Sequence, residues 1–578
     1  MSDQRDLSAV FELLAAMMEI SGANAFRINA TRKVARVLDD FEGDLRGAAS
    51  VKGGLEALDG IGKSSAERIR EWYEHGTIAD LETLRSEIPP GLIGLLKVSG
   101  LGPKTVGLLW READVVDRAT LREAINDGRL ASLPRMGAKT IANISDSLDF
   151  VEKAAERTSI GQALPLAESI IASLSAVQGV GQIEFAGSLR RGRETIGDID
   201  ILATAANPAS LVAALTERND VTKVLASGDT KASVRLDIGI QVDLRIVQPA
   251  EFGAALLYFT GSKEHNVHLR HVAQTRSLRL NEYGLFPDNG EEGTPQSRGV
   301  KPIAAKTEAE IYAALELPWH PPELREERDI IDTTPPTLLE VADIGCDLHS
   351  HTRASDGHLT IREMAEEAIR RGFHTLAITD HSKSSVQANG LKEDRLRKHI
   401  AAIHAVDAEM PDIRLLAGSE VDIHADGSLD YDDELLAELD IVVASPHAAL
   451  KQSPEDATAR LIAAVSHPHV HILGHPTGRM IGRRPGLEPD MQALVAAAAA
   501  NGTALEINAN PRRLDLCDRH VRLALEAGAT IAINTDAHAA EHFDFLRYGV
   551  LTGRRGRLTA ADCINAWPQA KLLAWLGR

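Results

Sequence analysis

The chain has 578 residues, too many for a single hydrophobic core, so we expect several domains. Its 63 basic and 83 acidic side chains give a formal net charge of −20, which argues against a general electrostatic attraction to nucleic acid and makes any DNA contact local. The three cysteines lack the C-x-x-C spacing of a zinc site and do not favour a disulfide framework. No apolar run reaches the length of about 18 residues that a membrane span needs, so we expect a cytoplasmic protein.

Residues 1 to 155 have helical periodicity and contain three similar glycine turns. LDGIGKSSAERI at 58–69, VSGLGPKTVGLL at 98–109 and LPRMGAKTIANI at 133–144 each place such a turn before a polar or basic helix start. In a helix-hairpin-helix unit this turn exposes backbone N–H groups, where a DNA phosphate binds without sequence readout. The third copy has Arg135 instead of its first glycine, so a purely structural hairpin is equally consistent with it. The predicted DNA-binding residues are Gly60, Gly62, Lys63, Gly100, Gly102 and Lys104.

The segment FAGSLRRGRETIGDIDIL, residues 185 to 202, combines a Gly-Ser turn, several arginines and two aspartates. Asp198 and Asp200 are two residues apart on an expected strand, so both carboxylates face the same side. Asp243 lies in a further apolar-flanked strand, QVDLRIV. Converging carboxylates bind divalent ions such as Mg²⁺ together with substrate phosphates. A bare D-x-D is equally compatible with a solvated strand end, but the nearby Gly187-Ser188 turn and Arg191 suit phosphate oxygens and favour the metal site.

With these motifs the chain resembles the X-family DNA polymerases, of which the β-type repair polymerase is best known. The resemblance includes GSLRRG, GDIDIL, VDLRIV and LLYFTGSKEHNVHLR at 256–270. It implies that Asp198, Asp200 and Asp243 are the catalytic metal ligands in an α+β nucleotidyltransferase palm. It also implies a nucleotide site in which the Gly-Ser turn and Arg191 bind the triphosphate, the YFTG segment lies along the sugar, and two later side chains reach the base pair. These residues are Gly187, Ser188, Arg191, Tyr258, Phe259, Gly261, Asn266 and Arg270.

Some members of this family use a lysine of the first domain as a Schiff-base nucleophile for lyase chemistry. Arg68 stands where that lysine is expected, and arginine stays protonated in proteins. We therefore expect lyase activity to be absent or weak unless Lys63 substitutes.

Residues 343 to 578 contain seven short apolar runs that end in polar residues, with helical patterns between them: CDLHSH, TLAITDH, LLAGSEVD, IVVASPH, ILGHP, ALEINAN and IAINTDAH. This alternation predicts a parallel barrel with its site at the carboxyl ends of the strands. A lone strand-end histidine is usually an ordinary core or surface residue, but nine candidates at one end favour a cluster of two or three Zn²⁺, Mn²⁺ or iron ions. They are His349, His351, Asp356, His381, Glu420, His447, His475, Asp536 and His538.

The same region resembles the PHP phosphoesterases, named for polymerase and histidinol phosphatase. The H-x-H start, TDH, the strand glutamate, the PH and GHP histidines and the final D-x-H carry the resemblance. It implies a (β/α)7-like barrel in which metal ions activate water for attack on phosphorus. Asp356 stands where some members have histidine, which affects metal preference. Lys383 and Arg479 are candidates for orienting the phosphate, and four residues are expected to support the site or the structure without binding metal: Asp380, Asp440, Glu506 and Asn508.

Together these motifs are similar to the bacterial PolX type, a β-like polymerase core fused to a PHP domain. The expected domains are a helical DNA-binding domain at 1–85, a fingers-like helix-hairpin-helix domain at 86–155, a palm at 156–250, a thumb at 251–318, a linker at 319–342 and the PHP domain at 343–578. The resemblance implies a DNA repair polymerase, expected to be a monomer, that fills gaps by dNTP addition with Mg²⁺ or Mn²⁺ in its palm. Its PHP domain would act as a 3′-5′ exonuclease, and the DNA would be gapped, nicked or 3′-recessed.

Two alternatives stay open at this point. One is a PHP phosphatase acting on a small metabolite, with a vestigial polymerase half. The intact GS, GDID and VDLR motifs speak against such decay. The other is a non-catalytic scaffold that binds DNA ends through the hairpins alone.

Overall fold

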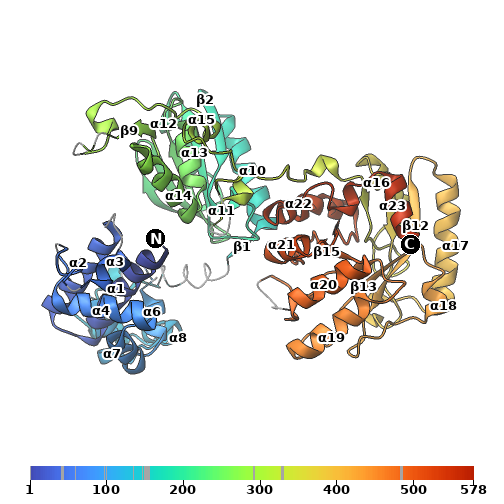
Figure 1. The fold of residues 1–578 in the computed structure, drawn as a ribbon, viewed down its shortest axis with the longest axis horizontal. Coiled ribbons are helices and arrows are strands. Elements are labelled where there is room, and N and C mark those ends of the chain that lie inside the picture. The colour runs from blue at the N-terminus through green and yellow to red at the C-terminus, as the bar shows by residue number, and fades with distance from the viewer. Residues whose placement is uncertain are drawn as a thin grey trace. The chain divides into compact units, whose positions relative to one another are not determined.

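The computed structural model forms two compact units, Met1–Glu156 and Arg157–Arg578 (Figure 1). It describes residues 2–40, 45–51, 53–58, 60–96, 98, 101–134, 136–142, 144–145, 148, 157–288, 290, 293–326, 331–481 and 486–577. Among these residues, no helix combines the length and the apolar character that crossing a membrane requires.

The first unit is helical, as the sequence predicts. Its helices are α1 (Ser2–Ser21), α2 (Ala25–Asp40), α3 (Leu45–Ser50), α4 (Lys63–His75), α5 (Ala79–Glu87), α6 (Gly91–Leu95), α7 (Pro103–Ala113), α8 (Arg118–Asn126) and the 3₁₀ turn η1 (Arg129–Ser132). Leu7, Phe11 and Leu14 of α1 are fully buried, at the spacing of one face of an amphipathic helix. This face packs against α2 and α7 and forms the centre of the helical core.

The second unit begins with a mixed five-stranded sheet in the order β2-β4-β7-β6-β5. Its strands are β2 (Val180–Phe185), β4 (Asp198–Ala205), β5 (Val221–Ser227), β6 (Lys231–Leu236) and β7 (Gln241–Ile246). The helices α10 (Ile160–Ser175), α11 (Gly187–Arg190) and α12 (Pro208–Thr216) pack against it, and β1 (Thr158–Ser159) pairs with β3 (Thr195–Ile196). The central strands β4 and β7 run parallel, while every other neighbouring pair of the sheet is antiparallel.

A helical segment follows the sheet and matches the expected thumb in its elements. It contains α13 (Phe252–Thr260), α14 (Lys263–Thr275), β8 (Leu278–Asn281), β9 (Gly284–Pro287), η2 (Gln296–Arg298), α15 (Glu308–Ala314) and η3 (Pro322–Leu324). The break between α13 and α14 falls at Gly261 and Ser262. The first residues of the predicted linker pack tightly here, because the Arg325 side chain is fully buried and pairs with Glu308 at 2.5 Å.

Seven parallel strands then follow one another around a barrel in chain order (Figure 1). They are β10 (Cys346–Asp347), β11 (Thr375–Ile378), β12 (Arg414–Asp422), β13 (Ile441–Ser445), β14 (Ile472–Leu473), β15 (Ala504–Asn508) and β16 (Ile531–Asn534). A parallel bridge between Ser350 and Ala537 links the first strand to the last, so the barrel is nearly closed. All seven coincide with the seven predicted apolar runs, which confirms the expected (β/α)7-like fold.

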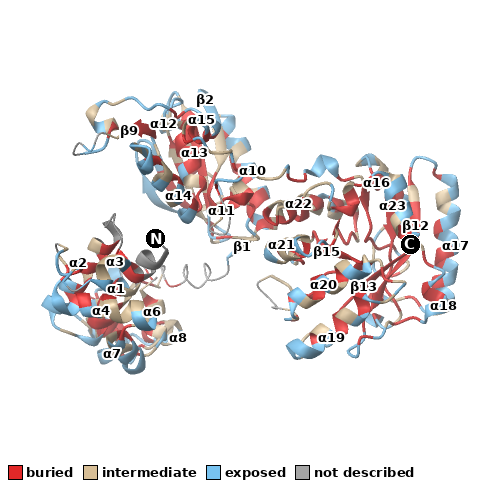
Figure 2. Ribbon diagram, in the orientation of Figure 1, coloured by how far each residue is buried: buried red, intermediate tan, exposed pale blue. Residues whose placement is uncertain are grey.

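Helices and short turns connect these strands and cover the outside of the barrel (Figures 1 and 2). They are η4 (Val341–Asp343), α16 (Ile361–Arg370), η5 (Val386–Ala388), α17 (Glu393–Glu409), α18 (Asp433–Leu436), α19 (Pro454–Val465), α20 (Met491–Asn501), α21 (Asp518–Glu526), η6 (Ala540–Phe545), α22 (Leu546–Arg555), η7 (Ile564–Ala566) and α23 (Gln569–Leu576). Strands β13, β15 and β16 are buried along their whole length, which explains their unbroken apolar character.

The mixed sheet packs directly against the barrel within this unit. Leu514 and Tyr548 of the barrel belong to the same apolar cluster as the sheet core. The Ser159 hydroxyl donates a hydrogen bond to the Pro511 carbonyl at 3.1 Å, and Arg547 pairs with Glu168 at 3.0 Å.

Candidate active sites

The palm carboxylates lie at the start of the two central parallel strands. Asp198 and Asp200 open β4 and line a cavity of about 800 Å³. Asp200 is the register partner of Asp243 on β7. The Asp243 carboxylate accepts hydrogen bonds from the Ser233 hydroxyl and, at 2.8 Å, from Gln241 Nε2, so it has a fixed orientation beside Asp200. Asp243 itself is not among the residues that line the cavity.

The electrostatics of these three acids fit a divalent cation. Burial, together with the charges of Asp198 and Asp243, raises the pKa of Asp200 to about 7. Burial and Asp243 also raise the pKa of Asp198. Carboxylates that raise one another's pKa stay ionised together when a cation lies between them. An all-oxygen donor set of this kind suits Mg²⁺ or Mn²⁺ bound with phosphate oxygens.

The cavity is completed by all eight residues that the sequence predicts to bind the nucleotide: Gly187, Ser188, Arg191, Tyr258, Phe259, Gly261, Asn266 and Arg270. Gly187 has a φ of 61°, and a Cβ there would clash with the Asp200 carboxylate, so the turn requires glycine. Arg157, Arg193 and Lys263 also line the cavity and are not among the predicted site residues. These three cations add positive charge around the carboxylates.

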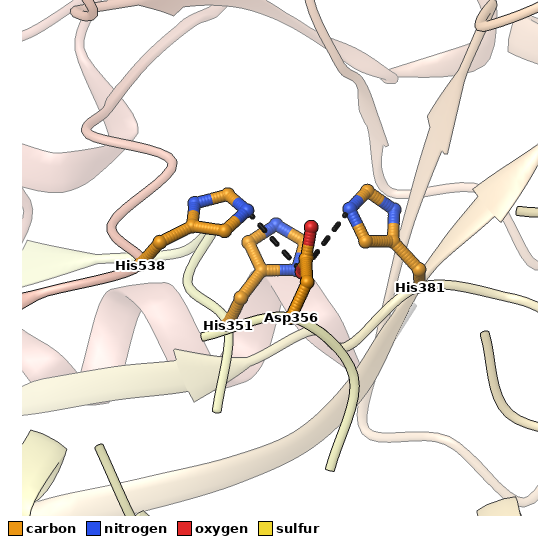
Figure 3. A group of neighbouring side chains, drawn as sticks. All are labelled: His351, Asp356, His381 and His538. Carbon is orange, nitrogen blue, oxygen red and sulfur yellow. Dashed lines mark ion pairs between the residues drawn. The ribbon is translucent and has the colours of Figure 1, made fainter. Parts of the chain in front are cut away.

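All nine predicted barrel ligands gather at the carboxyl ends of the strands. Asp356 lies between the rings of His381 and His538, at 3.6 and 3.4 Å, and His351 completes this group (Figure 3). Two further groups of candidate ligand atoms, each within 4.8 Å of one another, are His349 with His351 and Asp536, and His381 with Glu420 and His447. Because the groups share His351 and His381, they form one continuous cluster. His475 joins it through Nε2, which lies 2.9 Å from Glu420 Oε1.

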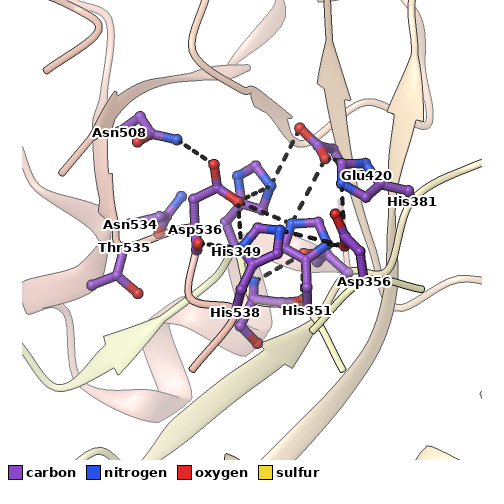
Figure 4. Close-up of polar contacts among 12 residues, drawn as sticks. His349, His351, Asp356, His381, Glu420, Asn508, Asn534, Thr535, Asp536 and His538 are labelled. Carbon is purple, nitrogen blue, oxygen red and sulfur yellow. Dashed lines mark hydrogen bonds and ion pairs between the residues drawn. The ribbon is translucent and has the colours of Figure 1, made fainter. Parts of the chain in front are cut away.

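The carboxylate charges and the buried ring nitrogens of this cluster suit bound metal cations. Burial lowers the pKa of His381, but the charges of Glu420 and Asp356 outweigh it and raise that pKa to about 11. Both ring nitrogens of His351 and Nε2 of His349 are buried and make no hydrogen bond to any described group. They lie 3.0 to 4.0 Å from carboxylate oxygens of neighbouring candidate ligands, to which Figure 4 draws ion pairs. Burying a polar nitrogen that makes no hydrogen bond lowers the stability of the folded protein. A donor set of imidazoles and carboxylates suits Zn²⁺, Mn²⁺ or iron.

Other buried polar groups orient these candidate ligands. Glu506 lies 2.8 Å from His349 Nδ1, and Asn508 donates to Asp536 at 3.1 Å (Figure 4). Asp422 lies 2.7 Å from His447 Nδ1 and was not predicted, although it follows Glu420 by two residues on β12 and so faces the same side. Asp380 lies 2.7 Å from His399 Nε2 and accepts hydrogen bonds from Thr352 and Ser355, while Asp440 accepts one from the Ala417 backbone.

The two cations expected to orient the phosphate are both bound to acids. Lys383 pairs with Glu393 at 2.7 Å, and Arg479 pairs with Glu194 of the palm at 2.6 Å. Arg513 is a further cation at this end of the barrel. It follows β15 by five residues, on the connection that leaves the carboxyl end of this strand. Burial and the charge of Arg513 lower the pKa of His475.

The helix-hairpin-helix turns adopt the expected geometry where they are described. Gly62 and Gly102 are the extended residues that precede α4 and α7, and a Cβ at either would meet open space. Gly60 has a positive φ, and Lys63 and Lys104 are exposed in the first turns of the two helices, whereas Gly100 lies outside the described residues. Arg68 pairs with Asp80 at 2.5 Å, which engages the side chain at the expected lyase position.

A palm with paired carboxylates and a phosphate-binding turn, joined to a barrel with a histidine and carboxylate cluster, defines a nucleotidyltransferase fused to a metal-dependent phosphoesterase. Family models agree with this class. The DNA polymerase beta thumb matches residues 255–326, the PHP domain 347–510, a helix-hairpin-helix domain 2–78 and a SAM-like helix-hairpin-helix tandem 92–149.

Individual relatives extend the match to the whole chain. The DNA polymerase/3′-5′ exonuclease PolX of Bacillus subtilis is 40% identical over 579 residues, covering 100% of this chain and 99% of the relative. DNA polymerase lambda of Rattus norvegicus is 26% identical over 47% of this chain and 48% of its own. A probable phosphatase of Syntrophotalea carbinolica is 30% identical over 34% of this chain and 80% of its own.

The chain belongs to the PolX family of DNA polymerase/3′-5′ exonucleases, which confirms the resemblance drawn from its motifs. Polymerase and PHP domains together imply that it acts on DNA and dNTPs and depends on metal ions.

Proposed function

We propose that this enzyme repairs DNA with two separate metal sites, one that adds deoxynucleotides and one that removes them from 3′ ends. The observation that carries this proposal is the presence of two complete donor sets on one chain. The palm has three carboxylates next to a cavity lined by all eight predicted nucleotide-binding residues. The barrel has nine histidine and carboxylate side chains at one end that could bind metal ions.

In the palm, Asp198, Asp200 and Asp243 would hold Mg²⁺ or Mn²⁺. When bound, these ions stabilise charge on the attacking and leaving oxygens. Ser188 and Arg191 bind the triphosphate through hydroxyl and guanidinium donors. The perpendicular rings of Tyr258 and Phe259, with centroids 5.1 Å apart, support the sugar. Asn266 and Arg270, on the next helix, contact the edge of the new base pair.

In the barrel, the nine clustered ligands would hold two or three ions of Zn²⁺, Mn²⁺ or iron. These ions supply Lewis acidity and activate water for attack on the terminal phosphodiester. Glu506 and Asp422 fix the orientation of His349 and His447 through hydrogen bonds. Arg513, on the connection after the carboxyl end of β15, would orient the scissile phosphate.

The DNA is gapped, nicked or 3′-recessed, and the protein acts as a monomer. Residues 1–155 contribute two helix-hairpin-helix domains, divided near residue 85. The backbone N–H groups after Gly62 and Gly102 hold DNA phosphates, with Lys63 and Lys104 beside them. The second unit contributes the palm at 156–250, the thumb at 251–318 and the barrel from 343. Because Arg68 cannot form a Schiff base, lyase activity is absent or weak.

A phosphatase acting on small metabolites is the main competing function, since a probable phosphatase is 30% identical over 34% of this chain. The completeness of the palm cavity speaks against a vestigial polymerase half. Primer extension and 3′-end degradation, measured on the purified full chain with gapped and 3′-recessed DNA, decide between them. Both activities are expected, with faster synthesis on the gapped substrate. No dNTP incorporation, combined with rapid hydrolysis of small phosphomonoesters, would overturn the proposal.

A further inference from the structure

A second cavity, of about 620 Å³, lies where the palm meets the barrel. Arg193 lines it from the palm, and Arg479, Arg519 and Arg555 line it from the barrel. We call it the interdomain cavity. Arg193 and Thr195 line both this cavity and the nucleotide cavity. The two spaces therefore adjoin each other.

The barrel wall of the interdomain cavity includes two arginines from connections that follow strands of the barrel. Arg479 belongs to the connection that leaves β14 and follows His475 in sequence. Arg519 is in the first turn of α21, directly after the connection that leaves β15. Both connections leave the carboxyl ends of strands, where the candidate ligands gather. The interdomain cavity therefore adjoins the nucleotide cavity on its palm side, and part of its barrel wall comes from the connections that follow β14 and β15.

Four arginines and three carboxylates line this cavity, and the carboxylate of Glu326 pairs with Arg193 at 3.3 Å and with Arg555 at 2.9 Å. Arg479 pairs with Glu194 at 2.6 Å, and Arg555 pairs with Asp518 at 2.8 Å. Arg519 is exposed, and its guanidinium has no ion pair with any residue that the structure describes. Phosphate oxygens form the same charge-assisted, bidentate bonds to arginine as carboxylates do, so they can replace these acids. The N-terminal end of α21 adds partial positive charge to the same wall.

We propose that the interdomain cavity binds the phosphodiester groups of a single-stranded primer 3′ end as that end passes from the palm to the barrel. This inference rests on the proposed function, because it takes both active sites as given. The volume is within the range of small-ligand sites and holds a short strand but not a duplex. Free nucleotides carry phosphate groups of the same kind, so the experiment must distinguish binding of a DNA strand from binding of a free nucleotide.

The test uses the full chain, a labelled primer–template with a three-nucleotide mismatched 3′ tail, and Arg519→Glu. Enzyme bound to this DNA is mixed with metal and excess unlabelled trap DNA, and the fraction of tails removed in one binding event is measured. We expect Arg519→Glu to lower this fraction by about tenfold, because a phosphate contact becomes repulsive. Primer extension and hydrolysis of thymidine 5′-(p-nitrophenyl) phosphate should stay unchanged. Arg362→Glu, on the exposed face of α16, is the matched control and should behave as wild type.

Three results would overturn the proposal. The first is an unchanged single-event fraction in Arg519→Glu. The second is an equal loss of activity on the small diester, because Arg519 would then act at the metal cluster. The third is Arg519-dependent binding of free dAMP or dATP in equilibrium dialysis without any effect on tail removal. Arg519→Lys keeps the charge and should retain most of the transfer, which separates charge from misfolding. Failure of the proposed function would give another result, because the wild-type protein itself would then leave the mismatched tail intact.

Discussion

The carboxylate of Glu326 pairs with the guanidinium of Arg191 at 3.2 Å, so an acid eight residues beyond the proposed thumb holds the arginine that we propose binds the triphosphate. Arg191 also donates a hydrogen bond to the Thr260 carbonyl at 2.5 Å. The same glutamate pairs with Arg555 of the barrel at 2.9 Å. An incoming triphosphate therefore competes with Glu326 for Arg191.

Glu326→Gln should tighten dNTP binding, because the neutral amide competes less well for Arg191. A change of about 1 kcal/mol corresponds to a roughly fivefold lower Kd for dNTP. Titration of dNTP into the enzyme–DNA complex measures this Kd. Glu316→Gln is the control, since this side chain is 82% exposed and pairs only with Arg276 among the described residues at 3.5 Å. Weaker dNTP binding in Glu326→Gln would mean that the glutamate positions Arg191 for the nucleotide.

Glu308 should make the stability of the thumb depend on acid pH. Burial raises its pKa, but Arg325 and Arg190 outweigh burial and lower that pKa from 4.5 to about 2. Because the folded pKa is below the unfolded one, this stabilisation is complete above about pH 4.5 and is lost as the pH falls toward 2. Amide hydrogen exchange of residues 308–326 measures the effect as a loss of protection at acid pH.

The corresponding variant Glu308→Gln should lower the free energy of local opening by about 3 kcal/mol at neutral pH and abolish this pH dependence. Glu310→Gln changes an exposed residue of the same helix and should change the free energy of local opening by less than about 0.5 kcal/mol. Equal protection in both variants would show that the buried ion pairs contribute nothing.

Asp422→Asn should weaken metal binding in the barrel. Its carboxylate accepts the Nδ1–H of His447 and thereby directs Nε2 toward Glu420, which lies 3.2 Å away. Loss of such a partner costs about 10- to 100-fold in metal affinity. Metal content after dialysis against graded chelator measures it. Asp426→Asn, an exposed acid on the same connection, should leave the metal content at the wild-type level. If Asp422→Asn also kept its metal, this role would be refuted.

Arg513→Ala should slow 3′-end removal by at least about tenfold, because a charge-assisted contact to the phosphate is lost. Synthesis should not change, since Arg513 lies outside the palm cavity. Comparison with Arg512→Ala, its exposed neighbour, controls for general loss of positive charge. Equal slowing in both variants would indicate long-range electrostatics instead of a specific contact.

The sequence predicts which candidate ligands lie close together, because local periodicity determines which side chains share a face. Asp198 and Asp200 share a side because strand side chains alternate, and the barrel histidines converge because parallel strands bring their carboxyl ends together. Asp422 could have been found by the same rule, from its spacing to Glu420.

Long-range partners could not be predicted in this way. Arg479 lies 285 residues from Glu194 in sequence, and Arg555 lies 229 residues from Glu326. Their pairing depends on how the palm packs against the barrel, which no local pattern encodes. Arg479 was therefore expected to orient the phosphate, whereas the structure pairs it with the palm.

The most direct test of the two-site account is a crossed comparison of Asp200→Asn and His349→Ala in the full chain, with synthesis and 3′-end degradation measured on the same DNA. The account predicts that Asp200→Asn lowers synthesis by at least about a hundredfold and spares degradation, and that His349→Ala does the reverse. If either variant, still folded, lost both activities together, the assignment of one reaction to each site would be contradicted.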